Sequence, residues 1–163
     1  DEPMFVRLGG WKGRLLPTLS IDPNGPDARE RSRYPISRAG ILALAELLLE
    51  NRRVDLERNV NLRCDVSENR PLNGRNCYYF CFEFAHPEES EVYRKSVQYI
   101  DSEWLVPICV QNYTWPDRGI EVSPFALDDA TLIEYYSYSN INTDLQLTDA
   151  DFDRENPEYR FRR

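Results

Sequence analysis

Alternating hydrophobic and polar positions between residues 92 and 115 predict two antiparallel β-strands joined near Ser102-Glu103. In each strand the apolar residues of this pattern fall on one face. These residues are Tyr93, Val97 and Tyr99 in the first strand and Trp104, Val106, Ile108 and Val110 in the second. A turn at Ser102-Glu103 would set Tyr99 opposite Val106, so that the two apolar faces coincide. Because a slip of one residue would turn this face to water, we expect the register to be well specified.

The second of these strands is also apolar on its other face, which carries Leu105, Cys109, Tyr113 and Trp115. A strand that is apolar on both faces needs cover on both. We therefore expect this hairpin to form the middle of a twisted antiparallel sheet that has a further element packed against it.

A second hairpin is expected from Val60–Val66 and Asn76–Ala85, since the intervening Asn73-Gly74 favours a type I′ turn. Its second strand carries an aromatic face made of Tyr78, Phe80, Phe82 and Phe84. Further strands are expected at Thr131–Ser139 and Met4–Leu8, whereas Pro17 makes Leu15–Ile21 either an edge strand or a loop. Together these segments predict an antiparallel sheet of about six to eight strands.

The segment from Ser37 to Asp55 predicts the one long helix of the chain. Ser37 is a good N-cap residue, and the preceding Ile36 can pack against Ile41 across the first turn. Apolar residues dominate the next positions, which are Ile41, Leu42, Leu44, Ala45, Leu47, Leu48 and Leu49. The apolar surface is therefore wider than one stripe. The helix either packs on a sheet face as an ordinary core element or covers an apolar cavity as a lid.

Composition supports a folded chain and excludes two classes of protein. Hydrophobic residues make up 41% and aromatic residues 12% of the 163 residues, which is enough for the core of one domain. The formal net charge of -8 argues against a general nucleic-acid-binding protein, which needs a basic surface. No apolar run reaches the length of a membrane-spanning helix, so we expect no transmembrane segment.

The four cysteines are Cys64, Cys77, Cys81 and Cys109. They form no CxxC pair, and the single histidine completes no zinc-ligand pattern. Cys77 and Cys81 lie too far apart along one strand to bond each other. Either Cys64 bridges to one of them in an oxidising compartment, or all four are small buried hydrophobic residues.

Two stretches are candidates for chemical sites. Cys81 and His86 are five positions apart on one strand, so their side chains point to opposite faces and a cysteine–histidine dyad is disfavoured. Asp149–Asp153 offers the first three ligand positions of a calcium loop, but Arg154 and Arg160 replace the turn glycine and the closing glutamate. We interpret it as a solvated acidic turn anchored inward by its phenylalanine. We expect no catalytic residues, no metal site and no cofactor, and hence a protein that is not an enzyme.

The aromatic residues on neighbouring strands carry the remaining functional hypothesis. They form either an ordinary core or the inner face of a concave sheet that holds an apolar ligand beneath the helix. Under the second interpretation the ligand-binding residues are Ile41, Leu44, Leu48, Tyr78, Phe80, Phe82, Tyr99, Val106, Ile108 and Tyr136.

Short motifs along almost the whole chain occur in a distinctive order. They are Gly10-Trp11-Lys12-Gly13, Leu16-Pro17-Thr18-Leu19-Ser20, Arg33-Tyr34-Pro35-Ile36, Gly40-Ile41, Asn73-Gly74-Arg75, Cys77, Ile100-Asp101, Val106-Pro107, Tyr113, Trp115-Pro116 and Leu147–Asp153. This set resembles an uncharacterised family of bacterial cell-envelope proteins of the DUF1571 type, which is similar to the lipoprotein-carrier superfold of LolA and LolB. The piece shared with that superfold is a strand, an Asp turn and a second strand, here Tyr99-Ile100-Asp101 and Leu105-Val106-Pro107.

The resemblance implies an open antiparallel half-barrel with helices at its mouth, located in the periplasm or otherwise outside the cytoplasm. It implies no catalytic residues. Such proteins carry a helix and several strands before the Gly10–Gly13 segment, whereas Asp1–Leu8 precedes it here. We therefore expect a single LolA-like domain over residues 1–163 that is a fragment or a trimmed version of the half-barrel. Its exposed edge strand would be open to self-association.

The expected fold is thus α+β, with a curved antiparallel sheet and one long helix on its concave face. The expected function is non-enzymatic binding of an apolar small molecule or lipid, such as an acyl chain or the lipid of a lipoprotein. The alternative is an interaction or structural module of the cell envelope, with a solid core, no ligand cavity and another envelope protein as its partner.

Overall fold

The computed structural model describes residues 3–7, 17–30, 34–35, 38–117, 119, 121–159 and 161. Contacts divide the chain into two compact units. One unit consists of Asp1–Ala39 with Asn142–Arg163, and the other of Gly40–Ile141. The expectation of one domain over residues 1–163 stays a prediction.

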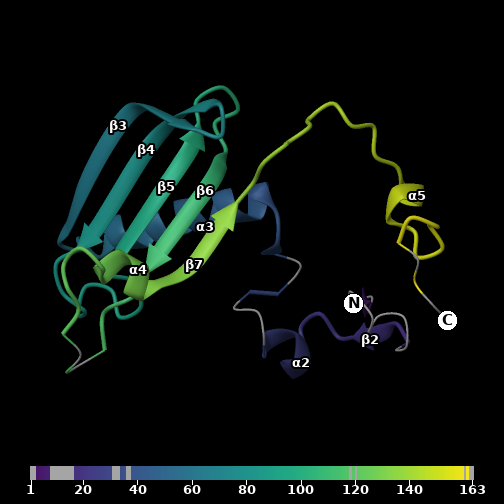
Figure 1. Ribbon diagram of the computed structural model, residues 1–163, viewed down its shortest axis with the longest axis horizontal. Coiled ribbons are helices and arrows are strands. Elements are labelled where there is room, and N and C mark those ends of the chain that lie inside the picture. Colours follow the sequence, from purple (N-terminus) through teal and green to yellow (C-terminus); the bar gives the residue numbers. More distant parts are fainter. Residues whose placement is uncertain are drawn as a thin grey trace. The chain divides into compact units, whose positions relative to one another are not determined.

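The larger unit is a five-stranded antiparallel sheet whose strands follow one another in chain order (Figure 1). The strands are β3 (Leu62–Leu72), β4 (Arg75–Phe84), β5 (Lys95–Asp101), β6 (Pro107–Tyr113) and β7 (Leu132–Ser137). Helix α3 (Ile41–Glu57) lies across one face, and the short α4 (Leu127–Thr131) leads into β7. The predicted α+β class and antiparallel sheet are confirmed.

The smaller unit contains the two-stranded sheet of β1 (Met4–Val6) and β2 (Leu19–Ile21), with the short helices α2 (Pro26–Arg29) and α5 (Asp149–Phe152). Among the described residues, the strands therefore form two sheets and not the one predicted sheet. The Gly10–Gly13 motif lies outside the described residues.

Helix α3 begins at Ile41 and not at the predicted Ser37. Gly40 precedes it with a φ of 112°, which no residue of an α-helix adopts, so the helical path starts only after this glycine. Ile36 and Ser37 lie outside the described residues, so the packing of Ile36 against Ile41 stays a prediction. At the other end, the helix continues two residues beyond the predicted end and includes Glu57.

The first hairpin follows the prediction. Asn73 and Gly74 join β3 to β4 with φ angles of 50° and 79°. Positive φ at both central positions is the type I′ geometry that matches the twist of a hairpin. Tyr78, Phe80 and Phe82 consequently point to one face of β4.

The register between β5 and β6 differs from the prediction. Tyr99 pairs with Cys109 and not with Val106, and a bulge leaves Ile108 without a direct partner on β5. The shift from Val106 to Cys109 is three positions, an odd number, so the two predicted apolar faces do not coincide. Val110 lies on the helix side of the sheet, whereas Tyr99 lies on the other.

The cause is the connection between these strands, which is longer than a tight turn. The buried Asp101 accepts hydrogen bonds at Oδ1 from the backbone N–H groups of Glu103 (3.0 Å) and Trp104 (2.9 Å). Leu105 then takes a positive φ of 56°, and the N–H of Asp101 donates to the carbonyl oxygen of Val106 at 2.9 Å. Asp101 therefore stabilises a connection that is longer than the predicted two-residue turn.

The core of the larger unit has one cluster on each side of the sheet. On the helix side, Leu44 and Leu48 of α3 pack against Val110, with Tyr136 and Tyr138 around them. On the opposite side, the cluster consists of Cys81, Val97 and Tyr113, flanked by Tyr79 and Tyr99. Apolar side chains are thus buried on both faces of the central strands, as their two-sided apolar pattern predicts.

Two smaller predictions are wrong. All four cysteines are free, and Cys64 is exposed, so the thiols are not uniformly buried. Cys64 pairs with Phe82 on the helix side, whereas Cys81 belongs to the opposite cluster, so the pleat keeps these two sulfur atoms on different faces.

Phe152 is 69% exposed and is not an inward anchor, because the acidic segment forms the one-turn helix α5 with a capping box between Thr148 and Asp151.

Candidate functional site

An apolar pocket lies between α3, strands β4 and β5, and the β5–β6 connection. Its volume is about 330 Å³. The side chains that line it are Ala45, Leu48, Leu49, Arg52, Tyr78, Phe80, Phe82, Gln98, Ile100, Leu105 and Pro107. A space of this size and character is typical of a small-molecule site.

Two periodicities bring these residues together. On α3, Ala45, Leu48, Leu49 and Arg52 follow the spacing of one helical stripe. On β4, alternate residues from Tyr78 to Phe82 share a face. Antiparallel pairing then sets Tyr78 beside Ile100 and Phe80 beside Gln98 on β5, which forms the floor of the pocket.

Arg52 is the polar side chain contributed by the helix. Its guanidinium carbon lies 4.2 Å from the centre of the Phe82 ring, and its Nη2 lies 2.8 Å from Asp55 Oδ2. Its Nε and Nη1 atoms are buried and have no hydrogen-bond partner within the described part of the chain. Burial lowers the pKa of Arg52 and raises that of Asp55, so desolvation outweighs the attraction between them.

The floor of the pocket is fixed by a buried chain of hydrogen bonds across three strands. Gln98 Nε2 donates to Ser96 Oγ at 3.4 Å, and Ser96 Oγ donates to Asn112 Oδ1 at 2.7 Å. Asn112 Nδ2 donates to Glu134 Oε2 at 2.6 Å, and the Tyr93 hydroxyl donates to Glu134 Oε1 at 3.0 Å. These contacts satisfy the polar groups beneath α3 and hold Gln98 in place.

The structure brings only some of the predicted ligand-binding residues to the pocket. Leu48, Tyr78, Phe80 and Phe82 line it. Of the others, Leu44 and Tyr136 belong to the core cluster beside it, Ile108 is 2% exposed, and Ile41 and Val106 are half-buried outside the lining. Tyr99 is on the far side of the sheet, 5.2 Å from Tyr79 between ring centres, so it cannot contact a ligand here.

Sequence reasoning missed several lining residues, and the reasons differ. Leu49 and Arg52 continue the helical spacing of Leu48, but the apolar surface of the helix is wider than one stripe, so its pattern does not show which residues face the sheet. Leu105 reaches the pocket through its positive φ of 56°, which leucine rarely adopts and no local pattern indicates.

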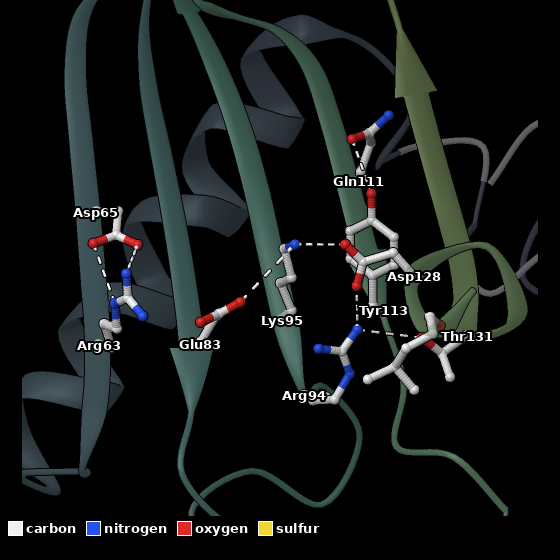
Figure 2. A network of polar contacts seen from close by, with 10 residues as sticks. Arg63, Asp65, Glu83, Arg94, Lys95, Gln111, Tyr113, Asp128 and Thr131 are labelled. Carbon is white, nitrogen blue, oxygen red and sulfur yellow. Dashed lines mark hydrogen bonds and ion pairs between the residues drawn. The ribbon is translucent and has the colours of Figure 1, made fainter. Parts of the chain in front are cut away.

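The opposite face of the sheet carries a polar network (Figure 2). Lys95 Nζ lies 2.6 Å from Asp128 Oδ2 of α4 and 3.9 Å from Glu83 Oε1. The Tyr113 hydroxyl donates to Gln111 Oε1 at 3.0 Å. This network joins α4 to the sheet. Within the described ranges, no three or more His, Cys, Asp or Glu side chains are placed to hold a metal ion.

The helices of the described residues include none with the length and apolar character needed to cross a bilayer.

The His86 side chain is exposed beyond the end of β4, whereas Cys81 is buried within it, so these two residues form no pair.

Comparison with known proteins gives one result. A family model described as "Protein of unknown function (DUF1571)" matches residues 1–161. The search of curated proteins gave no match, and neither did the search of solved structures. Because the match covers nearly the whole chain, this protein belongs to the DUF1571 family of proteins of unknown function.

Proposed function

We propose that the protein is a non-enzymatic binding protein that holds an apolar ligand, such as an acyl chain, between α3 and strands β4 and β5. The observation that carries this proposal is the 330 Å³ pocket lined by leucines of α3 and aromatic rings of β4. Each methylene group transferred from water into such a site contributes about 0.8 kcal/mol.

The size of the pocket favours a single chain over a lipid with several chains. Ligand sites range from about 300 to about 1,000 Å³, so this pocket lies at the small end. We therefore propose one acyl chain as the bound part, whether it belongs to a free lipid or to the lipid of a lipoprotein.

The polar groups at the pocket support binding without bond chemistry. They are the phenol of Tyr78, the amide of Gln98 and the guanidinium of Arg52. An amide and a guanidinium act neither as nucleophiles nor as bases near neutral pH, so neither suits an acid–base mechanism.

We also propose that the larger unit is a counterpart of the LolA-type half-barrel and that the protein acts outside the cytoplasm, in the periplasm. The support is the motif resemblance and the place of the pocket between an antiparallel sheet and the helix that covers it.

A neutral solvatochromic dye, Nile red, tests the proposal on the full chain. We expect saturable binding that decanoate displaces. Leu49→Asp should weaken binding about tenfold or more, because Leu49 lines the pocket yet is 62% exposed, so the variant can fold. Leu42→Asp is the matched control, since this leucine is 72% exposed on the same helix outside the lining. Equal binding by both variants and the wild type would exclude the pocket.

A second candidate function is an interaction module for another envelope protein. One observation favours it: Leu42, Leu49 and Leu56 are 72%, 62% and 80% exposed at intervals of seven residues, which keeps them on nearly one line of α3. The same experiment separates the two functions. An interaction module without a ligand site would not bind the dye saturably. The Leu49→Asp variant would then behave as the wild type does in this assay.

A further inference from the structure

We infer that the pocket selects a single apolar chain that ends in an anionic group, and that Arg52 binds this group. The inference rests on the proposed function, since it presupposes that an apolar chain enters the pocket. It adds the chemical class of the ligand and the residue that recognises it.

The first step of the argument is the position of Arg52. It lies one helical turn after Leu48 and packs on the ring of Phe82, at the end of the pocket away from Leu105. Among the described lining residues it is the one that carries a formal charge. A chain lying along the stripe of α3 would therefore bring its end group to a cation at this end and to apolar side chains elsewhere.

The second step is the unused hydrogen-bonding capacity of the guanidinium. Nη2 is held by Asp55, whereas Nε and Nη1 are buried without an acceptor in the part of the chain that the structure describes. A buried donor without a partner destabilises the folded protein. A carboxylate or phosphate supplies two or more oxygen acceptors in a geometry that suits a guanidinium.

The third step is the local charge balance. Two cations act on the carboxylate of Asp55, because Arg52 contacts it and the charge of Arg58 opposes the burial that raises its pKa. Two cations and one carboxylate leave one positive charge. One anionic end group would balance it.

Four ligands with the same chain length test the inference by calorimetry on the protein of residues 1–163. Decanoate and decyl phosphate should bind about tenfold or more tightly than neutral decanol, and decyltrimethylammonium should bind most weakly. Decanoate and decyl phosphate distinguish a fatty acid from a phosphate-bearing lipid as the natural source of the anion. Equal affinity for decanoate and decanol would overturn the inference.

Arg52→Gln should remove the preference for the anions, bringing decanoate to within about twofold of decanol. Arg53→Gln is the matched control, because it makes the same charge change at an exposed position next along the helix. If both variants lowered decanoate binding equally, a general charge effect and not Arg52 would explain the preference.

Asp55→Asn provides a second test whose expected effect has the opposite sign. Removing the competing carboxylate should strengthen decanoate binding several-fold and leave decanol unchanged. Weaker decanoate binding in a folded Asp55→Asn protein would contradict the charge balance. Failure of all four ligands to bind the wild type would refute the proposed function itself, whereas equal binding of decanoate and decanol would refute only the role of Arg52.

Discussion

At the scale of single residues, Leu105 shows best how this pocket depends on unusual backbone geometry. Its φ of 56° is a conformation that costs a residue with a Cβ atom about 1–2 kcal/mol, and its side chain is 67% exposed. The loop contacts of Asp101 and Val106 on either side hold this conformation in place. The leucine side chain thus lies at the rim of the pocket although its backbone conformation is locally unfavourable.

We predict that Leu105→Gly leaves stability unchanged or raises it by up to about 1 kcal/mol, because glycine adopts positive φ without strain. Leu105→Val should destabilise the protein by about 1 kcal/mol, since a branched Cβ fits this conformation poorly. Urea unfolding of both variants measures the difference. A glycine variant less stable than the valine variant would show that the side chain, and not the backbone, governs this position.

Individual residues also show how far sequence patterns predicted the site. The alternation on β4 correctly placed Tyr78, Phe80 and Phe82 together on one face, because a strand alternates strictly. Tyr99 was assigned to the same site through a predicted register. The side chain of Asp101 sets the actual register, which depends on contacts with residues distant in sequence.

At the scale of elements, the β5–β6 connection is stabilised by one buried carboxylate. Asp101 is fully buried and accepts a hydrogen bond from Arg75 Nη2 at 2.8 Å, besides an ion pair with Arg75 Nε. The guanidinium of Arg75 also lies 3.8 Å from the ring centre of Trp104. The hydrogen bond from Arg75 lowers the pKa of Asp101 to about 2, against the opposing effect of burial.

The pKa of Asp101 is lower in the folded state than in the unfolded state. Its contribution to stability is therefore complete above its ordinary pKa of 3.8 and is lost as the pH falls towards about 2. We predict that Asp101→Asn lowers stability near neutral pH by about 2 kcal/mol and flattens the acid limb of the stability profile. Chemical unfolding across this pH range measures both effects. Asp65→Asn is the control, since the Arg63–Asp65 pair is exposed and should contribute little to stability. An unchanged acid limb in Asp101→Asn would contradict this role.

Element boundaries were predictable where local chemistry determines them. Asn73-Gly74 fixed its hairpin because both residues accept positive φ. The start of α3 was misplaced because Ser37 is a favourable cap, whereas the backbone at Gly40 decides where the helix begins. Cap preference is a local tendency that the surrounding chain can override.

At the scale of the whole molecule, the contacts of the chain fall into two units, and the pocket belongs entirely to Gly40–Ile141. This unit has its own hydrophobic clusters on both sides of the five-stranded sheet. A unit with a complete core can fold on its own.

We therefore predict that a fragment of residues 40–141 folds cooperatively and binds Nile red as the full chain does. Circular dichroism during heating and dye titration check both properties. An unfolded fragment, together with a single unfolding transition of the full chain, would support one domain over residues 1–163 and contradict two independent units.

The overall fold class followed from the two periodicities of the sequence, but the division of strands between sheets did not. The segments of β1 and β2 look like other strands in the sequence, because their pattern does not reveal their pairing partners. The same limit applies to the pocket. Pattern identified leucines and aromatic residues, whereas Arg52 and Gln98 became part of the site through the way α3 lies on the sheet.

The central claim is that an apolar chain lies between α3 and the β4–β5 floor. Nuclear Overhauser contacts between isotope-labelled protein and unlabelled decanoate measure this directly. The account predicts contacts from the ligand chain to Leu49, Phe80 and Ile100 that saturate at one ligand per protein. Contacts confined to Tyr99 and Tyr113 on the opposite face, or no saturable contacts at all, would contradict it.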